Sequence, residues 1–174
     1  LMGITLVIRT EEWFASVPIH YELFQKLGFK QIEYAHPAPL MKLDKKGKSK
    51  RKLSKRKDPE ADVQYYIENG YPNEAIIEYF LTLANSNFYD WRIQNPDADT
   101  NEFQLKLEKF NKAGALFDIV KLEDICKDYI ATLSAEEIYE RSLNWAREYD
   151  EEVAKLLEEN KEYCINIFNI ERSG

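Results

Sequence analysis

The sequence has few of the residues that form local metal sites and disulfide frameworks. Its 174 residues include only two cysteines, Cys126 and Cys164, and two histidines. The cysteines lie far apart in the chain and no CxxC pair occurs, so we expect no zinc in this chain. A protein that is kept reduced is the simpler interpretation of so few cysteines.

Long apolar runs are also absent. The sequence contains no stretch of about 18 apolar residues, so we expect no transmembrane helix. The opening residues, LMGITLVIRT, lack the basic leader and the small-residue cleavage site of a secretory signal peptide. These absences predict a cytoplasmic protein that does not act at a membrane.

The chain begins with Leu1 and continues at once into an apolar, strand-like stretch. Because a free-standing domain rarely begins inside a core strand, we expect that the chain was cut from a longer protein. Met2 as the genuine start is the alternative. With 44% hydrophobic residues, the chain can bury a core, as one domain or as two small units.

Positive charge is concentrated in one short part of an acidic chain. The net charge is −7, yet residues 42–57 contain ten Lys or Arg and one acid, Asp44. This basic segment therefore carries +9, which leaves −16 for the other residues. A basic loop on an acidic body indicates a local contact with an anion rather than a general nucleic-acid surface.

The first part of the chain predicts a strand, a helix and a hairpin. Residues 4–9 alternate as a strand does. Ser16 suits a helix cap, Pro18 suits the first turn and Gly28 suits the end, with one apolar face formed by Ile19, Leu23, Phe24 and Leu27. Prolines keep residues 32–41 extended, and the basic segment then turns at Gly47.

From Pro59 onward the pattern is helical. One helix is expected at 60–69, before Gly70, and the next starts near Pro72 and buries Ile76, Ile77, Phe80 and Leu81. Residues 85–101 are rich in turn formers and predict a surface excursion. Ser134 and Glu137 form a capping-box pair, and a helix from Asp150 directs Val153, Leu156 and Leu157 inward.

The segment KLSKR, residues 52–56, allows several interpretations. A lysine-rich run is usually a solvated loop, and this one would also suit a nuclear localisation patch. The third interpretation is phosphate binding, in which paired cations close over a triphosphate and stabilise the departing pyrophosphate. Lys52 and Lys55 flank Leu53 and Ser54, a small residue that allows bending, and Arg56 follows.

KLSKR resembles the second ATP signature, of KMSKS type, of class I aminoacyl-tRNA synthetases, in the form typical of glutamyl-tRNA synthetases. Four flanking segments resemble the same family in the same order over residues 2–145. They are GITLVIRTEEWFASVPIHYELFQKLGF, YAHPAPLM, YIENGYPNEAIIEYFLTLA and KAGALFDIVKLEDICKDYI. The family counterparts of the first two read GITHVIRGEEWLSSTPKH and FAHLPLIL.

The resemblance implies an enzyme that activates glutamate with ATP and Mg²⁺ and then charges tRNA(Glu). A relative that charges glutamine tRNA with glutamate or glutamine is the alternative within the synthetases, although KLSKR and the VIRT segment favour the glutamate type. It places Lys52, Leu53, Ser54, Lys55 and Arg56 at the ATP, with Lys52 and Lys55 as the catalytic cations. It places Arg9 at the amino-acid pocket, where a guanidinium can hold a carboxylate in two places. The alternative is an Arg9 that only pairs with Glu11 or Glu12.

Two positions depart from the family pattern. Leu6 replaces a usual His, and Thr10 replaces a usual Gly that permits close backbone approach to a ligand. His36 matches a family His, but a lone His beside prolines is more often structural. Trp13 is expected to pack in the core.

The implied fold is mainly α. Residues 1–58 are expected to end a class I nucleotide-binding α/β catalytic domain, with strand, helix and hairpin loop. Residues 59–134 would form an all-helical stem-contact region, and 135–174 would begin the anticodon-binding domain. The family's HIGH-like motif does not occur in the sequence, so this chain alone should not activate glutamate. We expect the ligase to be a monomer. The alternative to a ligase is a non-catalytic helical module with a basic loop that binds tRNA or protein.

Overall fold

The computed structural model describes residues 2–44, 47 and 49–170 of a mostly helical chain. Contacts divide the chain into two compact units. The first unit comprises Leu1–Leu53 and Phe80–Asp118, and the second comprises Ser54–Tyr79 and Ile119–Gly174. Neither unit follows the three expected domain ranges, which remain a prediction. In the described part of the chain, no helix is both long and apolar enough to cross a membrane.

The first unit opens with a strand, a helix and a parallel strand. Strand β1 (Leu6–Ile8) pairs with β2 (Glu33–Ala35), and η1 (Glu11–Ser16) and α1 (Val17–Lys26) connect them. This order confirms the predicted strand and helix. Ser16 is at the N-cap position, but the predicted cap bond is wrong: its hydroxyl accepts no N–H of α1 and instead donates to the Trp13 carbonyl, 2.7 Å away. The apolar face of α1 is largely exposed.

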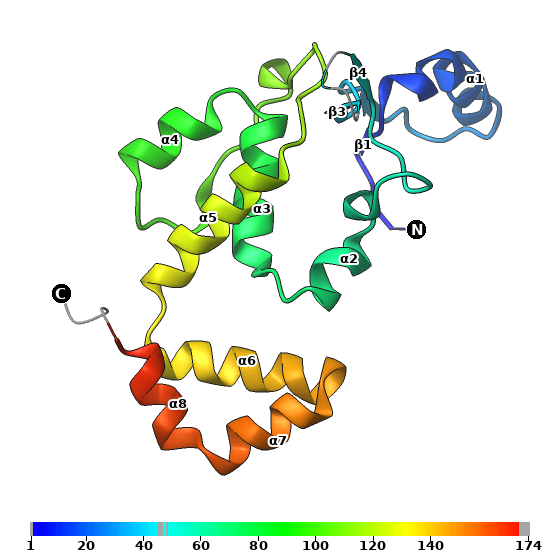
Figure 1. Cartoon of the computed structure of the whole chain (residues 1–174). Coiled ribbons are helices and arrows are strands. Elements are labelled where there is room, and N and C mark those ends of the chain that lie inside the picture. The colour runs from blue at the N-terminus through cyan, green and yellow to red at the C-terminus, as the bar shows by residue number, and fades with distance from the viewer. Residues whose placement is uncertain (1, 45–46, 48, 171–174) are drawn as a thin grey trace. The chain divides into compact units, whose positions relative to one another are not determined.

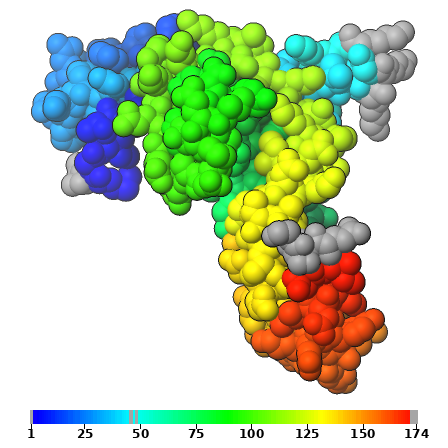
Figure 2. All heavy atoms as spheres, turned by 90° about the vertical axis from the view of Figure 1, so that its left-hand side faces the viewer, coloured from blue at the N-terminus to red at the C-terminus, as the bar shows by residue number. Residues whose placement is uncertain are grey.

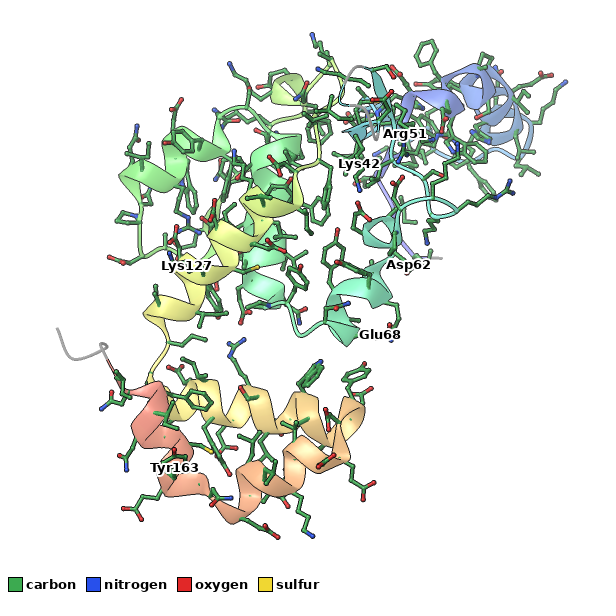
Figure 3. The ribbon with its side chains drawn as sticks, viewed as in Figure 1. Lys42, Arg51, Asp62, Glu68, Lys127 and Tyr163 are labelled. Carbon is green, nitrogen blue, oxygen red and sulfur yellow. The ribbon has the colours of Figure 1, made fainter. Side chains whose placement is uncertain are left out.

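The basic segment forms the predicted hairpin. Strands β3 (Met41–Leu43) and β4 (Lys50–Lys52) are antiparallel, with Lys42 opposite Arg51 (Figure 3). The other edge of β3 is occupied too, because the Met41 N–H donates to the Ala115 carbonyl at 2.8 Å. Gly114 makes this approach possible: its φ is 73°, and a Cβ there would lie 2.8 Å from the Met41 side chain.

The turn-rich stretch of the first unit contains an unexpected helix. Residues 88–94 form α4 (Phe88–Gln94), so the expected surface excursion is wrong over these positions. Phe88 is buried, and its ring meets that of Phe103 edge-on at 5.0 Å. The aromatic residues Phe88 and Trp91 lie three apart and share a helical face, which outweighs the turn formers that follow. Two short 3₁₀ segments complete this part, η3 (Thr100–Glu102) and η4 (Leu107–Lys109).

The second unit begins with η2 (Pro59–Ala61) and α2 (Val63–Glu68), whose ends are near the labelled Asp62 and Glu68 (Figure 3). The helix starts later than predicted because Asp62 caps it, accepting the Gln64 N–H. Helix α3 (Asn73–Ala84) follows and crosses the boundary between the units. Its buried residues are Ala75 and Tyr79, whereas Ile77, predicted to be buried, is 50% exposed.

Helices α6 (Ala135–Tyr149), α7 (Glu151–Glu159) and α8 (Lys161–Phe168) pack on one another after α5 (Ile119–Thr132) (Figure 1). As spheres, the orange and red residues form one closely packed body (Figure 2). The predicted capping box is confirmed: Ser134 accepts the Glu137 N–H, and Glu137 accepts in return. Leu157 joins the core around Tyr139, but Leu156, predicted to point inward, is 55% exposed.

An ion pair joins α3 to α6 within the second unit. Both Nη atoms of Arg141 donate to the Glu74 carboxylate, at 3.2 and 2.8 Å, and Nη2 also donates to the Tyr129 hydroxyl. Hydrogen bonding from Arg141 lowers the pKa of Glu74 from 4.5 to about 2. A carboxyl whose folded pKa is depressed stabilises the fold above its unfolded pKa and loses that effect as pH falls through the folded value.

We expect Glu74→Gln to lower the free energy of unfolding by about 1 kcal/mol at pH 7, a value that allows for solvent screening of a half-exposed pair. The difference from the wild type should shrink between pH 4.5 and about 2, as the wild-type carboxylate is protonated. Denaturant unfolding at pH 7 and pH 3 measures it. Glu159→Gln, which removes an exposed pair with Lys155 within α7, is the control and should change little. If Glu74→Gln lowers the free energy of unfolding equally at both pH values, the lowered pKa assigned to the Glu74 carboxyl is wrong.

Candidate functional site

The residues that follow β4 form a tight turn closed at both ends by Ser54 and Asp58. The Ser54 N–H donates to Oδ2 of Asp58 at 3.0 Å. In return, the N–H groups of Lys57 and Asp58 donate to the Ser54 carbonyl, both at 2.9 Å. The Asp58 side chain is almost completely buried, at 2% exposure. The turn therefore has a defined backbone conformation, fixed by a carboxylate beneath it.

This turn presents three consecutive cations, Lys55, Arg56 and Lys57, which are all exposed. Within the described residues, neither Lys55 nor Arg56 has a side-chain hydrogen bond or ion pair. Their charges are therefore not neutralised by neighbouring acids of the described chain. A short turn with exposed cations can receive an anion such as a polyphosphate.

Leu53 and Lys52 belong to the hairpin of the first unit. The Leu53 N–H donates to the Leu40 carbonyl at 2.9 Å, which extends the ladder of the hairpin by one residue. The Lys52 ammonium pairs with the Glu12 carboxylate of η1, and both side chains are about half exposed. The hydrogen bond from Lys52 lowers the pKa of Glu12. Any phosphate that binds Lys52 must therefore compete with Glu12.

The KLSKR segment thus crosses the boundary between the two units, after Leu53. The structure fixes the backbone on each side of that boundary. Of the five residues predicted to bind ATP, two lie on the hairpin and three on the Ser54–Asp58 turn. Their roles remain a prediction.

Arg9 lies just beyond β1 and is half buried. Its Nε donates to Nε2 of His36 at 3.3 Å, and its Nη2 lies 3.0 Å from Nδ1 of His20. Its guanidinium also lies 5.1 Å from the centre of the Tyr34 ring. Neither Glu11 nor Glu12 pairs with it in the described chain, so the interpretation of Arg9 as one half of a local ion pair is wrong.

The departures from the family pattern fall near this cluster. Thr10 has a φ of −60°, which any residue adopts, so the backbone there does not require glycine. Leu6 lies on β1 opposite Glu33. Trp13, expected in the core, is instead 56% exposed, and its ring contact is the Arg9 guanidinium at 5.8 Å.

A separate cavity of about 690 Å³ lies within the second unit, between the 67–73 segment and α6–α8. Arg141 and Trp145 line it, but none of the residues predicted to bind substrate does. Among the described residues, no group of three or more His, Cys, Asp or Glu side chains could hold a metal ion.

The sequence reasoning missed two groups that the structure brings to the site. In the sequence Asp58 marks only the end of the expected 1–58 domain. Its side chain accepts the N–H of Ser54, four residues earlier, whereas an Asx turn reaches two residues onward, so no local pattern indicates this bond. His20 was not singled out, and no local pattern connects it with Arg9 and His36. That convergence exists only in the folded chain.

Comparison with known proteins gives consistent results. Residues 1–124 match the family model of tRNA synthetases class I (E and Q), catalytic domain. The chain is 49% identical over its whole length to a glutamate–tRNA ligase of Clostridium perfringens and 51% identical to that of Acetivibrio thermocellus, covering 32% of each. It therefore spans about a third of the length of the curated relatives it matches.

Solved structures give the same result. A glutamate tRNA ligase from Elizabethkingia meningosepticum, crystallised in complex with its amino acid, matches with a TM-score of 0.64 and 27% identity. The glutamate–tRNA synthetase of Elizabethkingia anophelis matches with a TM-score of 0.67 and 26% identity. Each match covers 98% of this chain and 35% of the solved chain. The likeness extends over both units.

Proposed function

The chain belongs to the class I tRNA synthetases (E and Q), and we propose that it is part of a glutamate–tRNA ligase, which forms glutamyl-adenylate from glutamate and ATP and transfers the glutamyl group to tRNA(Glu). The observation that carries the proposal is the Ser54–Asp58 turn. It holds the exposed cations of a KLSKR segment in a chain that is about half identical to such ligases.

The chemistry needs alignment and charge stabilisation rather than a covalent enzyme intermediate. A carboxylate oxygen of glutamate attacks the α-phosphorus of ATP, and pyrophosphate leaves with the electron pair of the broken P–O bond. Lys55 and Arg56 are proposed to stabilise the charge on the departing pyrophosphate. Lys52 contributes when its ammonium leaves Glu12 for a phosphate oxygen. Mg²⁺ is proposed to arrive with the ATP. A ribose hydroxyl of the tRNA then attacks the adenylate carbonyl, and AMP leaves.

The acidic helical part is proposed to contact tRNA through few, specifically placed cations, so binding should show a correspondingly small salt dependence. In this proposal residues 59–134 contact the stem of the tRNA and 135–174 begin the anticodon-binding domain. We further propose that the ligase acts as a monomer in the cytoplasm.

Arg9 is proposed to bind a carboxylate of glutamate. We expect Arg9→Ala in the full-length protein to raise the KM for glutamate about tenfold, the loss of a charge-assisted hydrogen bond, while the KM for ATP stays unchanged. Steady-state ATP–pyrophosphate exchange at varied glutamate and varied ATP measures both constants. If the KM for ATP rises and that for glutamate does not, Arg9 does not bind the amino acid.

The function itself is tested by glutamate-dependent ATP–pyrophosphate exchange, with tRNA(Glu) added and omitted, on the full-length protein and on this chain alone. The proposal expects exchange by the full-length protein and none by this chain. The absence of exchange by the full-length protein in both conditions would contradict it. tRNA or protein binding without exchange would then support the helical module instead.

A further inference from the structure

Both histidines of the chain converge on one guanidinium. His20 comes from α1 and His36 follows β2, yet both rings stack on that of Tyr34, at centroid distances of 6.0 and 6.4 Å and nearly parallel to it. Each ring directs one nitrogen at Arg9, 3.0 Å away for His20 and 3.3 Å for His36. All three side chains are half buried. The guanidinium is therefore held from two directions.

The hydrogen bonds determine which nitrogen of each ring is unprotonated. A guanidinium only donates, so Nε2 of His36 and Nδ1 of His20 must each offer a lone pair. Each imidazole is then neutral in this arrangement, with its proton on the other nitrogen. Two of the five N–H groups of Arg9 are used in this way. Nη1 makes no hydrogen bond within the described residues and keeps both of its N–H groups for a ligand.

The chemical identity of these partners matters. A carboxylate would fix the guanidinium equally well, but it would neutralise the charge and compete with an anionic ligand. Neutral imidazoles fix the position of the guanidinium and leave its full positive charge available. Of the two acids considered as partners of Arg9, Glu12 is paired with Lys52 instead.

We propose that His20 and His36 are positioning residues that hold Arg9, uncompensated in charge, for the carboxylate of the amino-acid substrate. This rests on the proposed function, in which Arg9 binds glutamate. Holding the guanidinium in place before the substrate arrives reduces the conformational entropy that binding would otherwise cost. The two histidines act through Arg9 and need not touch the substrate.

The test compares alanine with shape-matched replacements in the full-length protein. Asn at position 20 can place an amide oxygen where Nδ1 lies, and Gln at position 36 can place one where Nε2 lies. We expect His20→Ala and His36→Ala each to raise the KM for glutamate three- to fivefold, with kcat and the KM for ATP unchanged. His20→Asn and His36→Gln should restore the KM for glutamate to within about twofold of the wild type.

Tyr21→Ala is the control for general packing. Its ring lies 6.0 Å from that of Tyr34, but within the described residues it makes no hydrogen bond or cation–π contact with Arg9, so the KM of this variant for glutamate should match that of the wild type. If the alanine variants raise both KM values equally, or Asn and Gln fail to restore binding, the positioning role is wrong. If Arg9→Ala itself leaves the KM for glutamate unchanged, the error lies in the proposed role of Arg9. If Arg9→Ala raises the KM for glutamate strongly but the His20 and His36 variants leave it unchanged, only the positioning role is wrong.

Discussion

Replacing Lys55 with alanine in the full-length protein should reduce the rate of glutamyl-adenylate formation by about 100-fold or more, with no measurable loss of stability. Lys55 is exposed on the Ser54–Asp58 turn and has no partner in the described chain, so the fold loses no interaction with it. Removing one group that stabilises the charge developing in the transition state lowers the rate by about 10²–10³-fold. ATP–pyrophosphate exchange measures the rate, and thermal unfolding measures the stability.

Lys57→Ala is the matched control for this change. Lys57 is an exposed cation of the same turn, but it lies outside the KLSKR segment. Its removal should change the exchange rate by no more than about threefold, because it lowers only the general positive potential of the turn. Equal losses for Lys55→Ala and Lys57→Ala would mean that the turn acts through its net charge, and the specific role of Lys55 would be wrong.

Asp58→Ala should reduce both stability and activity. Its carboxylate accepts the Ser54 N–H from an almost completely buried position, so alanine leaves that amide without its partner. The expected cost is about 1–3 kcal/mol in the free energy of unfolding. We also expect kcat for adenylate formation to fall about 30-fold, because the backbone that carries Lys55 is no longer held in one conformation. Denaturant unfolding and pyrophosphate exchange measure the two effects.

A second aspartate separates the two effects. Asp62 accepts the Gln64 N–H at 3.2 Å as the cap of α2, and Asp62→Ala should cost about 1 kcal/mol with normal exchange. Asp58→Asn keeps an oxygen acceptor and should recover most of the activity. An Asp58→Ala protein that is less stable but fully active would show that the turn needs no anchor for catalysis.

The accuracy of the sequence predictions depended on how far apart the interacting residues lie. The capping box of Ser134 and Glu137 was predicted correctly because both partners lie within one turn of the chain. The burial of α3 was partly wrong because periodicity alone does not show which side of an apolar helix faces the protein, and Ile77 lies outside the buried Ala75–Tyr79 line. Helix α4 was missed because nearby turn formers outnumber its aromatic residues.

In the candidate site, too, residues could be predicted from local segments, but contacts between distant segments could not. KLSKR was recognisable as a local string, and so was Arg9 in its segment. The partners of those residues were not, because Glu12 reaches Lys52 from η1 and His20 reaches Arg9 from α1 through tertiary packing. The residues proposed to contact substrates are therefore recognisable in the sequence, whereas Asp58 and His20, which contact them only in the folded chain, are not.

The close contact between Gly114 and β3 has a consequence for sequence variation. Gly114 has a φ of 73°, and a Cβ there would also lie 3.0 Å from the Pro39 carbonyl oxygen, which cannot move aside as a side chain does. Any other residue would push β3 away from Ala115 and displace the hairpin that ends in Lys52 and Leu53. In a screen of random substitutions for loss of activity, substitutions at position 114 should therefore reduce activity as substitutions in the KLSKR segment do, although Gly114 lies far from that segment in the chain.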